Sequence, residues 1–469
     1  MSGGPSAWVL LPPLVAIALA VRTRQVHLSL LAGIWIGALL VTGGHPLAGT
    51  AGTVEIIVQA ATEPGNARVL LFCLLIGPLV LYLETFQGVA GMVGALERRG
   101  LAGTPRGVRL LAWITGVVIF VESNVTLLVT GAVGRPLFDR HRLPREQLAY
   151  LADSTSAPVC VLIPFNAWGA FILGLLEAQH LDRPLAIFAA AIPLNLYAIV
   201  ALVLAGVVAW TGWSIGPMRH AGRRREPAAA VPTAFPEAMP TSAARPPAAA
   251  PPRAVNMVVP LAVMIASMPV GLFITGGGDL GAGSGSTSAL WAVLAGNIAA
   301  WILIRAQRLA TVPELVRLGI RGMESLLGPV LILVLSMALG AICAQLGTGL
   351  WLADRLQAFP VAPVLLPATF LVSAAIAFAT GTSWGTFAMT IPIAVPAAAS
   401  LALPVAPFLA ACLSGGIFGD HASPISDTTV VASLATGTGV IDHVRTQMPY
   451  ALLSAGAALI GFAILGVIL

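Results

Sequence analysis

A short polar stretch near the C-terminal end carries the side chains best suited to chemistry. It runs from Phe418 to Thr429, reads F-G-D-H-A-S-P-I-S-D-T-T, and lies between apolar segments. A proline among Ser, Asp and Thr predicts a broken helix, because the ring removes a backbone donor and the neighbours offer competing bonds. In lipid, freed backbone persists only where protein buries it or water reaches it, and ionisable groups at that depth mark ion or substrate paths. A solvated loop is the less favoured alternative.

A second stretch, from Ala152 to Pro158, has a similar local sequence and is predicted to break another helix. Asp153, Asp420 and Asp427 are hard oxygen ligands of the kind that a small cation needs. A carboxylate can hold a cation when ionised or a proton when neutral, so competition for one carboxylate is the simplest exchange mechanism. We therefore expect a transported Na⁺ at Asp153 and Asp420. The alternative for Asp153 is a helix N-cap.

Two further polar segments are expected at the tips of re-entrant hairpins. Glu122 with Ser123 and Asn124 forms the first tip, and Thr382 with Ser383 forms the second. Glu122 joins the expected cation and proton ligands, because an unpaired carboxylate in lipid is costly. His421 is either a proton relay or a hydrogen-bonded structural histidine. The remaining residues expected to surround the ion or a solute are Ser154, Thr155, Asn166, Ser423, Ser426 and Thr428.

Composition limits the class of protein. Of the 469 residues, 58% are hydrophobic and only 9% are charged, with a mean hydropathy of +0.93, whereas soluble domains carry roughly 25% charged residues. The chain is therefore a polytopic membrane protein whose main partner is the lipid bilayer. The net charge of +5 comes from loop arginines and indicates orientation, not nucleic-acid binding. Four scattered cysteines indicate neither disulfides nor zinc, and no cofactor is expected.

The distribution of arginines predicts the hairpins. Residues 110–138 have basic clusters at both ends, so a single crossing would put one cluster on the wrong side of the membrane. A re-entrant hairpin explains this pattern, because each of its two arms is too short to span the membrane. Residues 360–400 make a second hairpin, and residues 146–177 and 404–436 make the two broken helices, with 146–177 expected to break at 153–158 and again at 164–166. Residues 43–67 are expected to form an external loop with an amphipathic piece, residues 184–210 one span, and residues 447–469 the last span. Residues 214–253 are rich in Pro, Ala and Arg and read as a cytoplasmic linker.

The halves match element by element. We expect an all-α polytopic fold of about ten transmembrane helices plus two re-entrant helical hairpins, arranged as two inverted repeats, 1–213 and 254–469. Inverted repeats with broken helices bring cargo sites to their interface.

A competing motif is G-x-S-x-G at Gly381 to Gly385, with His421 as the nearest membrane-embedded histidine. These residues could describe a serine intramembrane hydrolase. The strand-to-helix elbow that the motif requires is not expected in an all-helical chain, so this reading is remote and we expect no enzyme.

The chain resembles the NhaC family of Na⁺/H⁺ antiporters, within the ion transporter superfamily. The resemblance covers nearly the whole chain and is carried by Arg135 to Asp139, Arg145 to Val159, Thr380 to Thr386 and Gly419 to Thr429. It implies Na⁺/H⁺ exchange, with some members similar to malate/lactate exchangers. This chain departs at the first tip, where Phe120-Val-Glu-Ser123 stands in place of the family's usual Phe-Asp-Asp-Tyr.

The expected function is secondary active transport in the plasma (inner) membrane, most simply antiport of Na⁺ and H⁺. The alternative is Na⁺- or H⁺-coupled transport of a small organic anion or amino acid, of the dicarboxylate or lactate type. The sequence leaves cargo, stoichiometry and a homodimer open.

Overall fold

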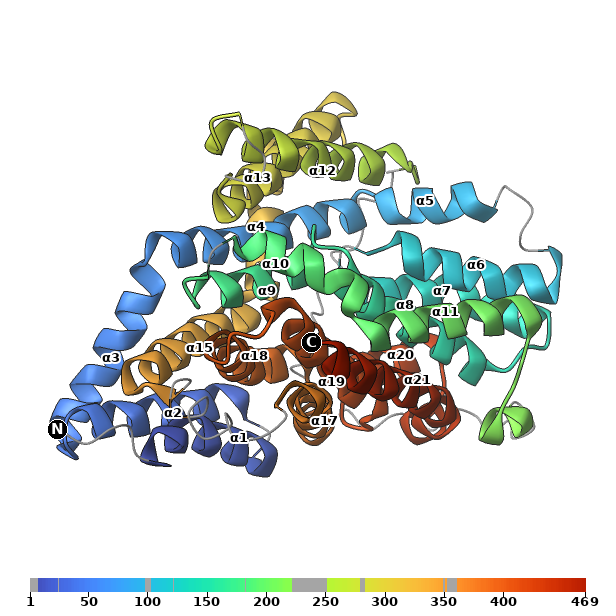
Figure 1. Cartoon of the computed structure of the whole chain (residues 1–469). Coiled ribbons are helices and arrows are strands. Elements are labelled where there is room, and N and C mark those ends of the chain that lie inside the picture. Colours follow the sequence, from blue (N-terminus) through green and yellow to red (C-terminus); the bar gives the residue numbers. More distant parts are fainter. Residues whose placement is uncertain are drawn as a thin grey trace.

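The computed structural model describes residues 7–23, 25–97, 103–120, 122–181, 183–221, 251–278, 283–348, 351 and 361–469. Every regular element in these ranges is a helix (Figure 1). Residues 222–250 of the expected linker and residue 360 of the second hairpin lie outside the described residues. The first half contains η1 (Ala7–Leu10), α1 (Leu11–Thr23), α2 (Val26–Val41), α3 (Pro46–Thr62), α4 (Pro64–Thr85), α5 (Gly88–Glu97), α6 (Pro105–Val118), α7 (Ser123–Arg140), α8 (Arg145–Leu162), α9 (Ala167–Glu177), α10 (Pro184–Ala191), η3 (Ile192–Leu194), α11 (Leu196–Thr211) and η4 (Gly216–His220). The second half contains α12 (Val255–Thr275), α13 (Gly285–Ala306), α14 (Val312–Ser325), α15 (Leu327–Leu346), α17 (Val361–Thr380), α18 (Ser383–Ser400), α19 (Val405–Ala422), α20 (Asp427–Thr436) and α21 (Val440–Ile468).

Many of these helices are suited to a bilayer. Within the described residues, seven are long and apolar enough to cross a membrane, and the pair α8 and α9, bent by 42°, adds an eighth if it is one span. Several more, such as α1 and α2, are apolar but shorter. The all-helical, multi-pass character expected from composition is therefore confirmed.

Three expected segments differ from the structure. Residues 46–62 form the helix α3, within the range 43–67 that was expected as an external loop with an amphipathic piece. The expected single span 184–210 is divided into α10 and α11 by η3, which contains Pro193. The expected break from Asp153 to Pro158 is wrong, because α8 continues to Leu162. The second break expected in this segment, at residues 164–166, is confirmed, because the chain bends between α8 and α9. Pro158 does not end α8. The helix around it is buried, and packing by neighbouring helices keeps it continuous.

The helix pattern recurs along the chain. The helices α7, α8 and α9 begin at Ser123, Arg145 and Ala167, and α18, α19 and α20 begin at Ser383, Val405 and Asp427. Each pair is separated by 260 residues (383 minus 123, 405 minus 145, 427 minus 167). This common offset aligns the two tips, Ser123 with Ser383, and the two breaks, Asn166 with Ser426.

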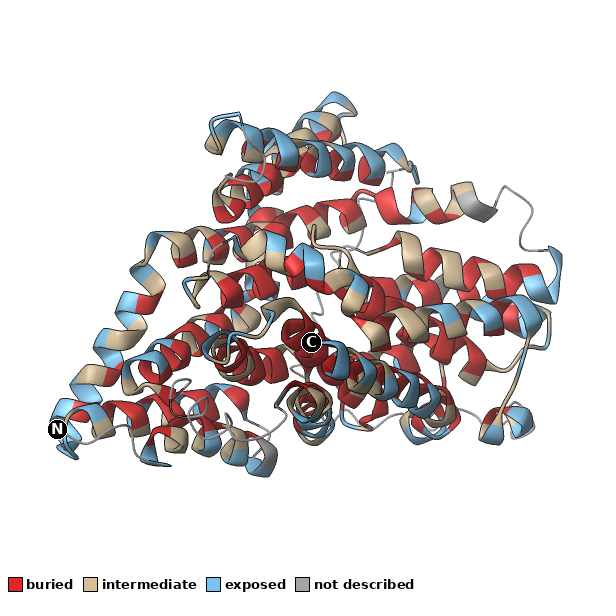
Figure 2. Cartoon of the chain, viewed as in Figure 1, coloured by how far each residue is buried: buried red, intermediate tan, exposed pale blue. Residues whose placement is uncertain are grey.

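The helix α19 is the centre of the packing. It contacts α17, α18 and α21 of its own half and α10 and α11 of the other half, and it lies near the middle of the molecule in Figure 1. A Cβ on Gly419 would lie 2.2 Å from the Ala374 carbonyl oxygen of α17, so only glycine allows this approach. The exposed residues gather on outer helices such as α12 and α13 (Figure 2).

Candidate functional site

The carboxylate of Asp420 lies where the turn between α17 and α18 meets the break between α19 and α20. Asp420 belongs to the last turn of α19 and is 1% exposed. Its Oδ2 accepts a hydrogen bond of 2.7 Å from Ser383 Oγ, at the start of α18. Its Oδ1 accepts one of 2.5 Å from Ser426 Oγ, in the break before α20. Two separate hydroxyl-bearing segments therefore converge on one buried carboxylate.

The break itself explains why these groups lie together. Ser426 also caps α20, since its Oγ accepts from Thr429 N, and Thr428 Oγ1 lies 3.0 Å from Ser426 Oγ. Asp427, the first residue of α20, is exposed and accepts from Thr428 N at 2.9 Å. Asp427 is therefore exposed, unlike the hydroxyls that surround Asp420, but it still lies within electrostatic range of Asp420.

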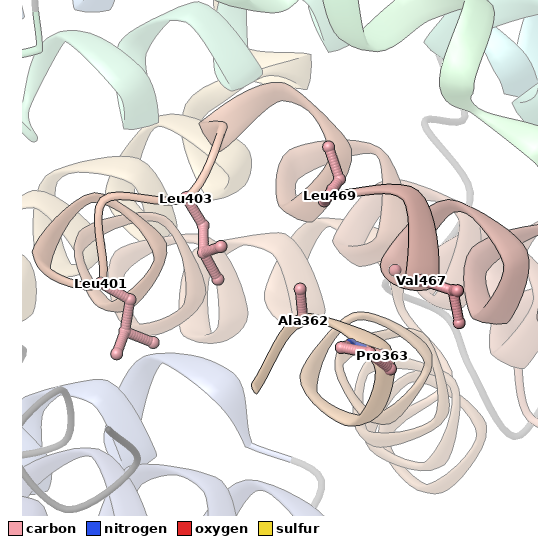
Figure 3. Close-up of a pocket in the computed structure, with 7 residues that line it drawn as sticks. Ala362, Pro363, Leu401, Leu403, Val467 and Leu469 are labelled. Carbon is pink, nitrogen blue, oxygen red and sulfur yellow. The ribbon is translucent and has the colours of Figure 1, made fainter. Parts of the chain in front are cut away.

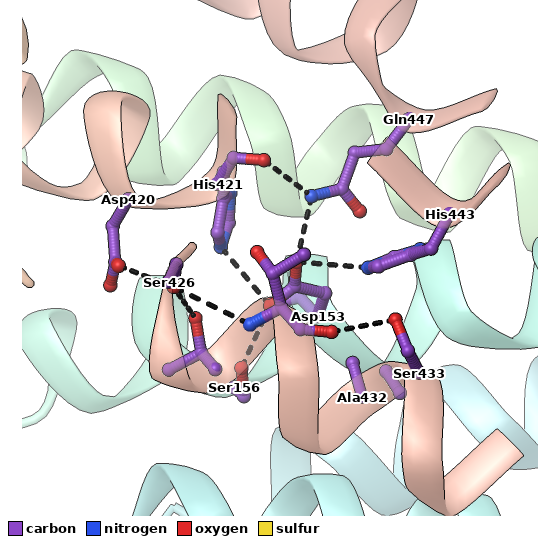
Figure 4. Close-up of polar contacts among 12 residues, drawn as sticks. Asp153, Ser156, Asp420, His421, Ser426, Ala432, Ser433, His443 and Gln447 are labelled. Carbon is purple, nitrogen blue, oxygen red and sulfur yellow. Dashed lines mark hydrogen bonds and ion pairs between the residues drawn. The ribbon is translucent and has the colours of Figure 1, made fainter. Parts of the chain in front are cut away.

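A second carboxylate, Asp153 in the middle of α8, is completely buried among nitrogen-bearing side chains. Its Oδ2 accepts from Gln447 Nε2 at 2.7 Å and is paired with His443 Nε2 at 3.2 Å, both from α21. Its Oδ1 lies 3.9 Å from His421 Nε2 of α19. The other ring nitrogen of His421 is 3.1 Å from the hydroxyl of Tyr197 on α11. Figure 4 shows Asp153 between His421, His443 and Gln447, with Asp420 to one side.

His443, Gln447 and Tyr197 were missed by sequence reasoning. The segment before residue 447 was interpreted as a loop with a later span, whereas α21 begins at Val440 and carries His443 into the protein. The available signal was the spacing of His443 and Gln447, which places them on one face of a helix. Tyr197 carried no comparable signal.

The first tip satisfies its own carboxylate. Glu122 precedes α7 and caps it, accepting from Val125 N at 2.9 Å. Ser123 Oγ and Asn124 Nδ2 donate to Glu122 Oε1 at 3.2 and 3.3 Å. Glu122 is half-buried and lies within electrostatic range of Glu84 and Asp427.

The other predicted site residues have structural partners instead. Asn166 caps α9 and its Nδ2 donates to the Phe120 carbonyl at 3.1 Å, which ties the first tip to the first break. Thr155 bonds back to the Leu151 carbonyl of its own helix, and Ser423 donates to the Phe378 carbonyl. Thr382 caps α18, accepting from Gly385 N. Ser154 is buried beside the Asp153 cluster and lines a narrow recess there.

Asp153 and Asp420 do not occupy equivalent places. Their local sequences are similar, but Asp153 lies in the middle of α8 whereas Asp420 lies in the last turn of α19. The offset of 260 residues aligns Asp420 with Cys160 instead (420 minus 260). The similar local sequences therefore do not make the two acids equivalent in position, although both lie beside His421.

The hydrolase motif lacks its catalytic pairing in the described structure. Ser383 Oγ donates to Asp420 and, more weakly, lies 3.3 Å from the Gly416 carbonyl. His421 instead pairs with Tyr197 and faces Asp153. A serine nucleophile needs a base within hydrogen-bond reach, and Ser383 has a carboxylate as its acid–base neighbour. This geometry favours an ion site over a nucleophile.

A surface hollow at the end of α21 has a different character. Figure 3 shows it among apolar side chains, with Leu401 and Leu403 on one side and Val467 and Leu469 on the other. None of the side chains in this lining carries an oxygen or a nitrogen, so the hollow offers an ion no side-chain ligand.

Comparison with known proteins decides the family. The model of the Na⁺/H⁺ antiporter family matches residues 159–467. The chain belongs to the Na⁺/H⁺ antiporter family. The resemblance noted from the sequence is thus confirmed, and secondary transport is the activity that this family and its named members indicate.

Two relatives of this antiporter family member differ in how much of their length matches the chain. An uncharacterised protein of Haemophilus influenzae is 33% identical over 98% of this chain and 91% of its own length. The malate-2H⁺/Na⁺-lactate antiporter of Bacillus subtilis is 38% identical over 85 residues, 18% of each chain.

Two solved structures share the fold. The Neisseria gonorrhoeae MtrF, described among antimetabolite efflux pumps, has a TM-score of 0.62 at 14% identity and covers 91% of this chain and 85% of its own. The YdaH transporter of Alcanivorax borkumensis has a TM-score of 0.58 at 17% identity, covering 89% of this chain and 88% of its own. At these identities the likeness concerns the fold alone.

Proposed function

We propose that this antiporter exchanges Na⁺ for H⁺, with the cation bound at Asp420. The observation that carries the proposal is the convergence of Ser383 and Ser426 on a buried Asp420 carboxylate. Na⁺ prefers oxygen ligands, and hydroxyls that now donate to the carboxylate can rotate to present lone pairs to a cation. Carbonyls freed at the neighbouring breaks supply further oxygens.

The remaining acids take supporting roles in this proposal. Asp153 is the second carboxylate that exchange requires. Glu122 and Asp427, which lie within electrostatic range of each other, attract cations toward the site. Ser123, Asn124 and Thr428 offer further oxygens near these carboxylates.

The proposed architecture is two inverted repeats, residues 1–213 and 254–469, in the inner membrane. The pairs α6–α7 and α17–α18 are the re-entrant hairpins, corresponding to the expected ranges 110–138 and 360–400. The offset of 260 residues between their second arms supports this assignment. The segment 214–253 is a cytoplasmic linker.

A second candidate is coupled transport of a small organic anion. One observation favours it: a relative that matches this chain over 85 residues is named for malate and lactate. Na⁺/H⁺ exchange remains the simpler proposal, because it needs only the Asp420 and Asp153 groups.

The test is transport by the purified protein in liposomes with an internal pH dye. A panel of Na⁺, K⁺, lactate, malate and arginine is added separately to the outside. We expect a pH change with Na⁺ alone. A pH change that requires lactate or malate together with Na⁺ would establish the second candidate instead.

A further inference from the structure

We propose that the proton and the cation use different carboxylates: the cluster of Asp153, His421, His443, Gln447 and Tyr197 carries the proton while Asp420 holds Na⁺. This inference rests on the proposed exchange and deepens it. It replaces competition for one carboxylate by coupling between two neighbouring sites.

The two carboxylates have ligands of different chemistry. Asp420 is bonded by the hydroxyls of Ser383 and Ser426, which are oxygen ligands for a hard cation. Asp153 is bonded instead by the nitrogens of His443 and Gln447. Imidazole and amide nitrogens are poor ligands for Na⁺, but histidine beside a carboxylate is well suited to proton transfer.

Unpartnered polar atoms in the cluster point to a small missing ligand. Asp153 Oδ1, His421 Nε2, His443 Nδ1 and Gln447 Oε1 are all buried without a hydrogen-bond partner. A network with only a structural role would leave few such atoms, because each buried polar atom without a hydrogen bond costs free energy. Four of them in one cluster fit a site that gains and loses a proton during its cycle.

The hydrogen bond between Tyr197 and His421 determines which ring nitrogen of His421 faces Asp153 with a proton. If the Tyr197 hydroxyl donates to Nδ1, the ring proton resides on Nε2 and faces Asp153 Oδ1 at 3.9 Å. His443 Nε2 approaches the opposite carboxylate oxygen, Oδ2. Four titratable side chains therefore surround Asp153: His421 of α19, His443 of α21, Tyr197 of α11 and Tyr150 of α8. Asp420 precedes His421 in α19.

A narrow recess lies beside this cluster. Tyr197, His421 and Gln447 line it together with Tyr450 and Ser454 of α21. The Tyr450 hydroxyl accepts from Ile215 N and donates to the Trp213 carbonyl, at the surface turn after α11. The Tyr450 hydroxyl therefore ties this recess to the turn after α11.

Coupling follows from the closeness of the Asp420 and Asp153 sites. The two carboxylates lie within electrostatic range of each other, so a Na⁺ at one and a proton at the other repel strongly in a region of low dielectric. Na⁺ binding therefore expels the proton from the Asp153 cluster, and a proton there weakens Na⁺ binding.

The experiment compares two transport modes of the full-length protein in liposomes. Na⁺/H⁺ exchange is read as ²²Na⁺ efflux driven by a pH gradient. Na⁺/Na⁺ exchange is read as ²²Na⁺ efflux driven by external Na⁺ at equal pH, and it requires no proton. The test variants are His443→Gln, which keeps a donor toward Asp153 but cannot titrate, and Tyr197→Phe. The control is His220→Gln, because His220 is exposed in η4.

We expect both test variants to lose Na⁺/H⁺ exchange by about a hundredfold, the lower end of the range for a missing acid–base group, while Na⁺/Na⁺ exchange stays within about twofold. Equal loss of both modes, or retention of both, would overturn the separation of sites. Tyr197→Phe decides the outcome if His443→Gln does not fold. A wild-type protein that performs neither mode would instead refute the proposed function, and this inference with it.

Discussion

Two serines near Asp420 give a matched test of its surroundings. Ser383 Oγ donates to Asp420 at 2.7 Å, whereas Ser423 Oγ donates to the Phe378 carbonyl at 2.9 Å. Both are buried hydroxyls that make a bond of ordinary length. We expect Ser383→Ala to raise the KM for Na⁺ by about tenfold, the loss typical of one hydrogen bond to a charged group. Ser423→Ala should change the KM by less than about twofold, and similar effects of the two variants would contradict the Asp420 site.

At the residue scale, sequence reasoning found the carboxylates but not their partners. Asp153, Asp420 and the hydroxyls of the two motifs stand out because polar groups are rare in an apolar chain. His443 and Gln447 meet Asp153 from 290 and more residues away in sequence. Such long-range pairing depends on how helices pack, and no local pattern in the chain encodes it.

At the scale of elements, the second hairpin tip depends on one glycine. Gly381 ends α17 with φ +71°, and a Cβ there would lie 2.7 Å from the Ile425 carbonyl oxygen in the break of α19 and α20. Gly347 ends α15 with nearly the same φ, +72°, but has no atom within 4 Å of its Cβ position. Comparing alanine substitutions at Gly381 and Gly347 therefore separates the effect of backbone strain, which both share, from the effect of steric contact, which only Gly381 has.

We expect Gly381→Ala to lower the melting temperature clearly more than Gly347→Ala and to impair Na⁺ transport. The strain of a left-handed alanine, about 1 kcal/mol, is common to both variants. The contact with Ile425 is specific to Gly381. Melting temperatures in detergent and transport in liposomes are the measurements, and equal effects of the two substitutions would argue against a tip packed on the break.

Most helices could be predicted from hydrophobic runs and their arginine-rich ends, as α12, α13 and α15 show. The failures have a physical cause. Proline at 158 indicated a break, but a buried helix can keep proline where neighbouring helices support it, and the bend lies at the second predicted break, where Asn166 caps α9. The similar sequences around Asp153 and Asp420 likewise suggested equivalent positions, whereas the offset between the two sets of helices pairs Asp420 with Cys160.

At the scale of the whole molecule, the proposed topology places residues 222–250 in the cytoplasm. Their composition of Arg, Pro and Ala favours the cytoplasmic side and disfavours a folded core. We expect protease to cut the chain there in inverted membrane vesicles and not in intact cells. Cleavage from outside intact cells would reverse the proposed orientation of both repeats.

The central claim, that Asp420 binds the cation and Asp153 completes the exchange, is tested most directly by three matched substitutions. Asn keeps the size of Asp and an acceptor oxygen but removes the charge. Asp420→Asn and Asp153→Asn should each remain folded and abolish the collapse of a pH gradient by Na⁺ in proteoliposomes. Asp427→Asn, which changes an exposed carboxylate, should have a milder effect. Normal collapse of the pH gradient in both Asp420→Asn and Asp153→Asn, at unchanged melting temperature, would contradict the account.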